Sequence, residues 1–289
     1  MARTATTGPW SLLRKDLGGG PLPWSALGCL SGRLFSFGGD GWSATVQASD
    51  DGGRTWTVLQ GNCPPRLYAA GAIMDRRLWI AGGQENDDVW CSRDGRTWSR
   101  AAARAPWGRR WAHALVPFAG RLYLLAGTEV GQGPRGDVWA WDGLDWRVVN
   151  ARAFTPRYGA AGAVLGDRMV LLGGAANSEA PPLAEALISL DHGRTWTFRP
   201  VPWAPRWGAA AATLDGALYL VGGVGTSGAI CRDVWATRDA VTWTPMGEAP
   251  WTRLTGFGLG ACGDHLVLAG GVDWDKLNRA VWAFRPPAA

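Results

Sequence analysis

The sequence predicts an all-β protein built as a ring of six repeats, a six-bladed β-propeller, on three observations. A hydrophobic run ends six times in a pair of small residues, and a polar loop and a Trp-bearing run follow. The repeat length matches the roughly 40 to 50 residues of one propeller blade. The pairs are Gly38-Gly39, Gly82-Gly83, Gly127-Thr128, Gly173-Gly174, Gly222-Gly223 and Gly270-Gly271, spaced by 44, 45, 46, 49 and 48 residues.

Each repeat divides into four predicted strands. In the fifth repeat they begin near Trp207, Ala217, Asp233 and Thr242, with Gly and Asp turns between them. Short β-forming runs at regular intervals favour an antiparallel meander over helices. The predicted blades span about residues 22–60, 66–102, 110–150, 157–200, 206–247 and 253–285.

The last repeat lacks a fourth strand, because the chain ends shortly after Val281-Trp282. Residues 9–14 supply a counterpart, since Trp10-Ser11-Leu12-Leu13 resembles Trp56-Thr57-Val58-Leu59. A ring left open would expose unpaired backbone groups at its seam. We therefore expect the N-terminal strand to complete the sixth blade, so that residues 1–289 form a single closed domain.

The repeat resembles the kelch repeat over essentially the whole chain, as Arg206, Gly222-Gly223, Asp233 and Trp235 illustrate. Segments 49–56 and 189–196 also resemble Asp-boxes, with the pattern S-x-D-x-G-x-T-W, and shorter versions occur at 92–98 and 237–243. This resemblance implies structural turns in which aspartate binds backbone amides and tryptophan packs between blades. The residues concerned are Asp51, Asp94, Asp191, Asp239, Trp56, Trp98, Trp146, Trp196 and Trp243.

Composition limits the function classes. The net charge of +5, from 29 basic and 24 acidic residues, is spread over all repeats, unlike the clustered footprint of a nucleic-acid-binding protein. The five cysteines, at positions 29, 63, 91, 231 and 262, have no C-x-x-C spacing and support neither a disulfide framework nor a zinc site. No run approaches the roughly 20 apolar residues of a membrane span, and no signal peptide is visible. A cytoplasmic protein without nucleic-acid or membrane partners is predicted.

The loops that enter the innermost strands carry a repeated arginine. It occurs at Arg66, Arg110, Arg157, Arg206 and Arg253, whereas the first repeat has Leu22 there. We expect these five side chains to surround one end of the central channel. Because arginine keeps its charge, such a ring must be neutralised by acids, solvent or a bound anion. Its fork of donors suits a carboxylate or phosphate.

Aromatic residues accompany these arginines. Pro-Trp occurs at Pro23-Trp24, Pro106-Trp107, Pro202-Trp203 and Pro250-Trp251, and Trp111, Tyr158 and Trp207 directly follow three arginines. Rigid aromatics beside arginine suit a flat or sugar-like molecule, or an acidic peptide. The predicted ligand-binding residues are therefore the five arginines together with Trp24, Trp107, Trp111, Tyr158, Trp203, Trp207 and Trp251.

A structural alternative accounts for the same residues. Acids of the loops between second and third strands could neutralise the arginines, and the Pro-Trp tryptophans could pack at the rim. These acids are Asp40, Glu85, Asp87, Glu129, Glu179, Asp273 and Asp275. Asp88, Asp137 and Asp233, which precede the third strands, are expected to bind backbone.

Two residues are candidates for acid–base chemistry. His113 lies three residues after Arg110 and could act on a ligand in the channel, although a hydrogen-bonded core histidine is the alternative. Glu129 could act beside an arginine that holds the substrate anion. His192 and His265 are expected on the opposite face, so neither a histidine metal site nor a cofactor is predicted.

Two classes of function fit these features. The chain is similar in architecture to bacterial N-acetylneuraminate epimerases, which implies isomerase chemistry on a small anionic sugar. Kelch domains of ubiquitin-ligase adaptors hold acidic peptides through arginines, which implies a protein-interaction module. Loops 128–137, 175–185 and 272–279 are more elaborate than a scaffold needs, so the sequence favours binding of a small anionic, sugar-like or aromatic molecule. Acidic-peptide recognition is the alternative, and whether the chain is an enzyme stays open.

Overall fold

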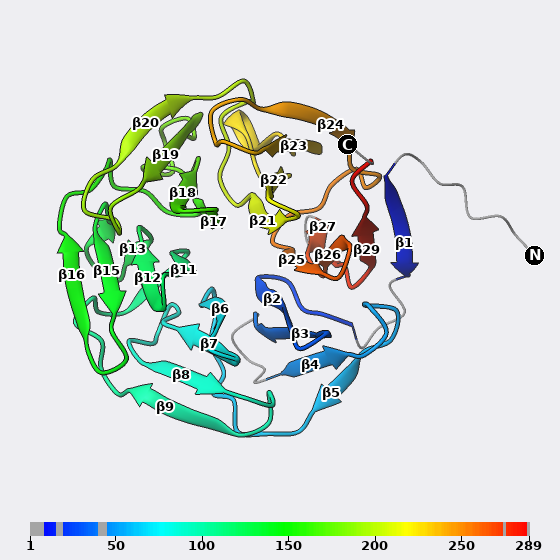
Figure 1. Ribbon diagram of the computed structural model, residues 1–289, viewed down its shortest axis with the longest axis horizontal. Coiled ribbons are helices and arrows are strands. Elements are labelled where there is room, and N and C mark those ends of the chain that lie inside the picture. The colour runs from blue at the N-terminus through cyan, green and yellow to red at the C-terminus, as the bar shows by residue number, and fades with distance from the viewer. Residues whose placement is uncertain (1–8, 16–19, 40–44, 274–275, 288–289) are drawn as a thin grey trace, which may run out of the picture.

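Six four-stranded antiparallel sheets make up the described part of the molecule, which covers residues 9–15, 20–39, 45–273 and 276–287 of this computed structural model. No α-helix occurs in these residues, and none of their helical turns could cross a membrane. Figure 1 shows the sheets placed around a common centre, with β2, β6, β11, β17, β21 and β25 nearest to it. The prediction of an all-β protein is therefore confirmed.

In five of these sheets the four strands come from one repeat and lie side by side in chain order. The first two sheets are β2 (Ser25–Leu30), β3 (Arg33–Gly38), β4 (Val46–Ser49) and β5 (Thr57–Leu59), and then β6 (Ala70–Met74), β7 (Arg77–Ala81), β8 (Val89–Ser92) and β9 (Trp98–Ala102). The third sheet is β11 (Ala114–Phe118), β12 (Arg121–Leu125), β15 (Val138–Trp141) and β16 (Trp146–Asn150). The last two of the five are β17 (Ala161–Leu165), β18 (Arg168–Leu172), β19 (Glu185–Ser189) and β20 (Thr197–Pro200), and then β21 (Ala210–Leu214), β22 (Ala217–Val221), β23 (Asp233–Thr237) and β24 (Thr244–Glu248). Two small additions are the β10 (Arg110–Trp111), β13 (Thr128–Glu129) and β14 (Gly133–Pro134) sheet and the β27 (Val272–Asp273) and β28 (Lys276–Leu277) pair.

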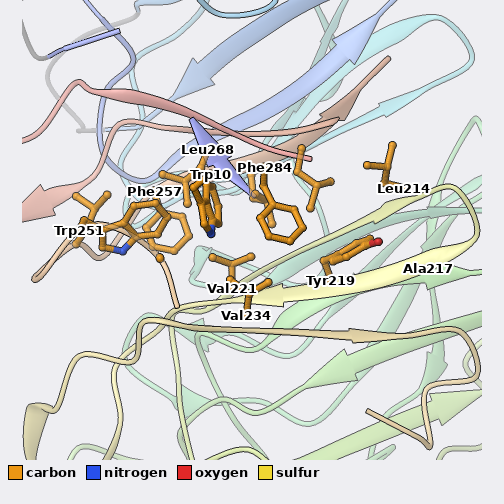
Figure 2. Packing of buried hydrophobic residues seen from close by; sticks show 14 residues of the cluster. Trp10, Leu214, Ala217, Tyr219, Val221, Val234, Trp251, Phe257, Leu268 and Phe284 are labelled. Atoms are coloured by element: carbon orange, nitrogen blue, oxygen red, sulfur yellow. The ribbon is translucent and has the colours of Figure 1, made fainter. Parts of the chain in front are cut away.

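The remaining sheet joins the two ends of the chain. Its order is β1 (Trp10–Arg14), β29 (Val281–Phe284), β26 (His265–Ala269) and β25 (Gly258–Cys262). Trp10 is 2 % exposed, and its ring centroid lies 4.9 Å from those of both Trp251 and Phe284. Figure 2 shows Trp10 among the hydrophobic side chains of this cluster. The N-terminal strand thus contributes a tryptophan to the hydrophobic cluster formed by the sheet of the fifth repeat and the last sheet.

Burial follows strand position within a sheet. The second strands are hydrophobic runs with both faces covered; β22, for example, is buried throughout. The outermost strand β20 is exposed along its whole length. The innermost strands contain small residues where neighbouring sheets come close together. A Cβ at Gly71 would lie 2.4 Å from that of Ala26, and one at Gly162 would lie 2.6 Å from that of Ala114. Neighbouring sheets can approach closely at the centre only because these side chains are absent.

The small-residue pairs allow contact between successive sheets. Gly82, Gly173 and Gly222 have positive φ, and a Cβ at Gly173 would lie 2.5 Å from the Arg206 carbonyl oxygen of the next repeat. The following glycine donates its amide across the same boundary, as Gly174 does to Arg206 at 2.9 Å. In the third repeat the equivalent pair is Ala126-Gly127, both with positive φ, one residue earlier than the sequence pattern indicates.

In the turns that resemble Asp-boxes, the aspartate accepts hydrogen bonds from residues of its own turn. A carboxylate oxygen of Asp51 accepts the amides of Arg54 (3.0 Å) and Thr55 (2.9 Å), and its partner oxygen accepts the Thr55 hydroxyl (2.6 Å). Asp191 makes the same bonds to Thr195. Trp98, Trp146 and Trp243 are buried, whereas Trp56 and Trp196 are partly exposed.

One expectation about the cysteines is wrong. A disulfide joins Cys29 of β2 to Cys262 of β25, with Cα atoms 5.4 Å apart. The two residues are 233 positions apart in sequence, and only the meeting of the first and last innermost strands makes them neighbours. Spacing along the chain could not have revealed this pair.

Replacing Trp10 should destabilise the protein strongly. Trp10→Ala removes a large, fully buried ring, so we expect the free energy of unfolding to fall by about 3–5 kcal/mol. Leu144→Ala, at a residue that is 83 % exposed, should change it by less than about 0.5 kcal/mol. Chemical denaturation measures both values, and equal stability of the two variants would contradict the role of β1.

Stability should depend on the aspartates of the four turns at acid pH. Burial acts to raise the pKa of Asp51, but hydrogen bonds from Thr55, Ser49 and Arg54 lower it to about 2. The pKa values of Asp94, Asp191 and Asp239 are lowered similarly. Because the folded pKa lies below the unfolded value of 3.8, this stability is present above about pH 4 and is lost as the pH falls towards 2.

The test compares urea unfolding of the wild type and Asp51→Asn between neutral and acid pH. The variant should lose less stability on acidification than the wild type, with Thr55→Val, which removes one hydrogen bond to Asp51, lying between them. Parallel profiles for all three proteins would show that the Asp51 carboxylate does not contribute.

Candidate functional site

The six loops that enter the innermost strands share one backbone conformation. Each contains a residue with φ between +51° and +65°: Trp24, Tyr68, Ala112, Gly159, Gly208 and Gly256. Two residues earlier lie Leu22, Arg66, Arg110, Arg157, Arg206 and Leu254. Arg253 is therefore one position out of register with the other arginines; it is exposed, whereas Leu254 is fully buried.

The four arginines at the shared position are buried. Arg66, Arg110, Arg157 and Arg206 are between 0 % and 2 % exposed. Nη1 of Arg66, Arg157 and Arg206 donates to the carbonyl of the glycine sixteen residues later, at 2.9–3.0 Å, and Arg110 donates to Ala126 at 3.3 Å. The guanidinium thus connects the entering loop to the end of the second strand in the same repeat.

An acid near the start of the third strand neutralises each of these arginines. Arg206 binds both oxygens of Asp233 (2.7 and 2.8 Å), and Arg110 binds Asp137 in the same way (2.6 and 3.0 Å). Arg157 pairs with Glu185 at 2.5 Å, and Arg66 pairs with Asp88 at 3.0 Å. Of the loop acids considered from the sequence, Glu129 adds a longer contact of 3.8 Å to Arg110, and the four closest partners are other residues.

The aspartates of the Asp-Val-Trp motif bind side chains, which corrects the expectation that they bind backbone. The indole N–H groups of Trp90, Trp139 and Trp235 donate to Asp88, Asp137 and Asp233, at 2.6–2.8 Å. Burial by itself would raise the pKa of Asp233, but the hydrogen bonds from Arg206 and Trp235 bring it below the usual value. A buried arginine, a partly exposed aspartate and a partly exposed tryptophan therefore form one hydrogen-bonded unit.

Three of the Pro-Trp tryptophans belong to the core. Trp107, Trp203 and Trp251 are 1 %, 2 % and 7 % exposed, and each lies three residues before the shared arginine or leucine. Each packs against an outer-strand tryptophan: Trp146, Trp243 and Trp10 respectively. Trp24 lies two residues after the shared residue Leu22 and not three before it, so it does not occupy this core position.

A cavity of about 460 Å³ lies where the innermost strands begin. Its wall contains five aromatic side chains, which we call the aromatic mouth: Trp24, Tyr68, Trp111, Tyr158 and Trp207. Neighbouring rings are 5.3, 5.5, 6.2 and 5.8 Å apart between centroids, in that order along the chain. Phe257 adds a further aromatic surface. The volume falls within the range of ordinary ligand pockets, and the lining is predominantly apolar.

The backbone holds these rings in place. Trp111, Tyr158 and Trp207 are each paired with the loop after the second strand, at Thr128, Ala175 and Val224. Trp24 and Tyr68 have left-handed φ values of 58° and 57°, which cost bulky residues about 1–3 kcal/mol each. In the fourth to sixth repeats a glycine occupies the same position. Strained aromatics at the wall of a cavity are a sign of a functional site.

Amide hydrogen bonds also link the mouth from repeat to repeat. Ala112 donates to Tyr68 (3.2 Å), Gly159 to Ala112 (2.8 Å), Gly208 to Gly159 (2.7 Å), and Trp24 to Gly256 (2.5 Å). The aromatic residues are consequently presented on a connected backbone rather than on separate loops.

The two candidates for acid–base chemistry are not brought together in the cavity. His113 lines it, but both ring nitrogens are buried and without a hydrogen-bond partner among the described residues. Burial, with the charge of Arg110, lowers the pKa of His113 to about 3. Glu129 binds Arg135 (2.6 Å) and Arg110 (3.8 Å) and is not among the residues that line the cavity.

Other loop acids also have partners outside the cavity. Glu85 pairs with Arg109 at 3.4 Å, and Asp87 pairs with Arg104 at 3.7 Å. Asp40 and Asp275 lie outside the described residues. Among the described residues, no group of three or more His, Cys, Asp or Glu side chains could hold a metal ion.

Besides His113, sequence reasoning identified four aromatic residues of this lining, Trp24, Trp111, Tyr158 and Trp207, and missed Tyr68 and Phe257. Tyr68 lies two residues after its arginine, whereas Trp111 lies one residue after, so no single repeat position selects both. The available signal was an aromatic residue within two positions of the shared residue in five consecutive repeats.

Removing either member of the Arg206–Asp233 pair should destabilise the fold unequally. The Arg206 side chain is 1 % exposed and that of Asp233 is 34 % exposed. Asp233→Ala leaves a buried cation and should cost about 3–5 kcal/mol. Arg206→Met leaves a carboxylate that water can reach and should cost about 1–3 kcal/mol. Urea unfolding distinguishes the two, and a loss below about 1 kcal/mol for Asp233→Ala would contradict this account.

Comparison with known proteins supports the fold. No protein-family model matches the chain. Kelch domain-containing protein 3 from human is 24 % identical over 194 residues, and the bovine and mouse proteins are 25 % identical over 195 residues. These matches cover 57 % of this chain and 50 % of each relative, so the matched region spans about half the length of the curated relatives. Together with the four-stranded antiparallel sheets, this homology supports a kelch-repeat β-propeller.

Proposed function

We propose that the chain is a closed, six-bladed kelch propeller that recognises a segment of a partner protein in the cavity of the aromatic mouth. Homology to kelch domain-containing proteins suggests a protein-interaction function. The observation that supports this cavity as the binding site is the row of five partly exposed aromatic side chains along its wall. Aromatic residues dominate the energetic centres of protein interfaces.

Three contacts support ring closure. β1 pairs with β29, the Cys29–Cys262 disulfide joins the first and last innermost strands, and the Trp24 amide donates to Gly256. Under this proposal the blades follow the boundaries expected from the sequence, with residues 9–14 in the sixth blade. Each contact joins the first repeat or the N-terminal strand to the last repeat.

The preformed backbone also supports binding. The rings are held by strand-like pairing and by the amide bonds between repeats, so little conformational entropy would be lost when a partner binds. The four buried arginines help to fix the loops rather than line the cavity. Acidic-peptide binding through these arginines therefore receives no support from their positions.

A sugar-like or aromatic small molecule is the second candidate occupant. The cavity volume of about 460 Å³ would accommodate one, and aromatic faces suit flat rings. The isomerase chemistry implied by the epimerase resemblance lacks the carboxylate or imidazole expected for it, because no carboxylate lines this cavity in the described residues and the His113 nitrogens are buried.

Binding should depend on the aromatic mouth. We expect peptides selected from a random library displayed on phage to bind the full chain, and Trp111→Ala or Trp207→Ala to weaken that binding by at least about tenfold, as for interface hot spots. Isothermal titration of the selected peptides measures the change. Competition by a sugar acid or an aromatic carboxylate tests the second candidate in the same assay.

Val58→Ala is the control, because Val58 is an exposed residue of an outer strand and should leave binding unchanged. Thermal unfolding of each variant separates a lost contact from a lost fold. No selected peptide, or peptides that bind the two tryptophan variants as well as the wild type, would refute the proposal.

A further inference from the structure

A second cavity opens beside the aromatic mouth. This side groove has a volume of about 430 Å³ and shares Tyr158 and Trp207 with the first cavity. Its other walls are the loop 175–182, between β18 and β19, and the loop 224–228, between β22 and β23. The two rings therefore stand between the cavities, and an extended chain could run from one to the other across them.

The walls of the side groove are held in a defined shape. The backbone of Tyr158 exchanges two hydrogen bonds of 2.9 Å with Ala175, and Trp207 exchanges bonds of 3.0 and 2.8 Å with Val224. The Asn177 side chain accepts the amides of Glu179 (2.9 Å) and Ala180 (2.6 Å). Both loops are thus attached to the two aromatic residues whose rings they face across the groove.

Electrostatics selects the kind of side chain that the side groove would accept. Among the described residues that line the two cavities, Glu179 is the one carboxylate, and no lysine or arginine joins it. No ion pair to Glu179 occurs within the described part of the chain. By contrast, Glu85, Asp87 and Glu129 on the neighbouring loops each have an arginine partner.

The arginines next to the two rings in sequence do not offset this negative charge. Arg157 and Arg206 immediately precede Tyr158 and Trp207, but each is paired with its own acid, Glu185 or Asp233. An exposed carboxylate beside two aromatic rings is complementary to a cation, which the ring faces also attract. An anionic side chain would be repelled there.

We infer that the side groove receives an arginine or lysine side chain of the bound segment, placed against Tyr158 and Trp207 and paired with Glu179. This inference rests on the proposed function and adds the charge of the partner to it. The segment is thus expected to be basic, opposite in charge to the acidic peptide that was the alternative from the sequence.

The test uses peptides selected on the wild-type chain and synthesised in matched forms. In one form a basic residue is arginine, and in the other it is citrulline, which keeps the shape and loses the charge. We expect the citrulline peptide to bind the wild type about three- to tenfold more weakly, and to bind Glu179→Gln as well as the arginine peptide does.

Glu85→Gln is the matched control, because Glu85 is an exposed acid of a neighbouring loop that does not line the side groove. It should keep the full difference between arginine and citrulline. Peptides that depend on Trp111 but show no preference for arginine, or a preference that persists in Glu179→Gln, would overturn this inference and leave the proposed function standing. Failure to obtain any Trp111-dependent peptide would overturn both.

Discussion

The buried arginine of the second to fifth repeats is the constraint on which the loops of the aromatic mouth depend. A guanidinium cannot lose its charge, so burial requires an acid and further acceptors. Arg206 meets this requirement with Asp233, the Gly222 carbonyl and the Ala204 carbonyl. One side chain thereby ties the entering loop, the end of the second strand and the start of the third together. The aromatic residue that follows the arginine is therefore held in a fixed position.

The aromatic mouth is a product of this arrangement and of the backbone bonds between repeats. Trp111, Tyr158 and Trp207 follow buried arginines directly, so their rings are carried at the edge of the cavity. Trp24 and Tyr68 occupy left-handed positions that glycine fills in other repeats, at a cost in stability. Core packing alone does not require large rings at these two positions. The proposed function gives these two rings a role.

The first and last strands of the chain pair in the last sheet. Trp10 packs on Trp251 as Trp146 packs on Trp107 and Trp243 on Trp203, so the first strand supplies to the last sheet the tryptophan that the third and fifth repeats carry within themselves. The loops of the fourth and fifth repeats then break the symmetry. Their side groove contains Glu179, which is the one carboxylate among the described residues that line the two cavities.

The sequence by itself determined the all-β class, the repeats, the turn aspartates and most of the aromatic residues, because these depend on spacing and local hydrogen bonding. Only the tertiary structure decided that the arginines are neutralised within their own repeats, that Trp107, Trp203 and Trp251 are buried, and that Cys29 meets Cys262. Spacing cannot state whether a charged side chain points into a cavity or into a sheet. That outcome depends on which partners surround it after residues far apart in the sequence have come together.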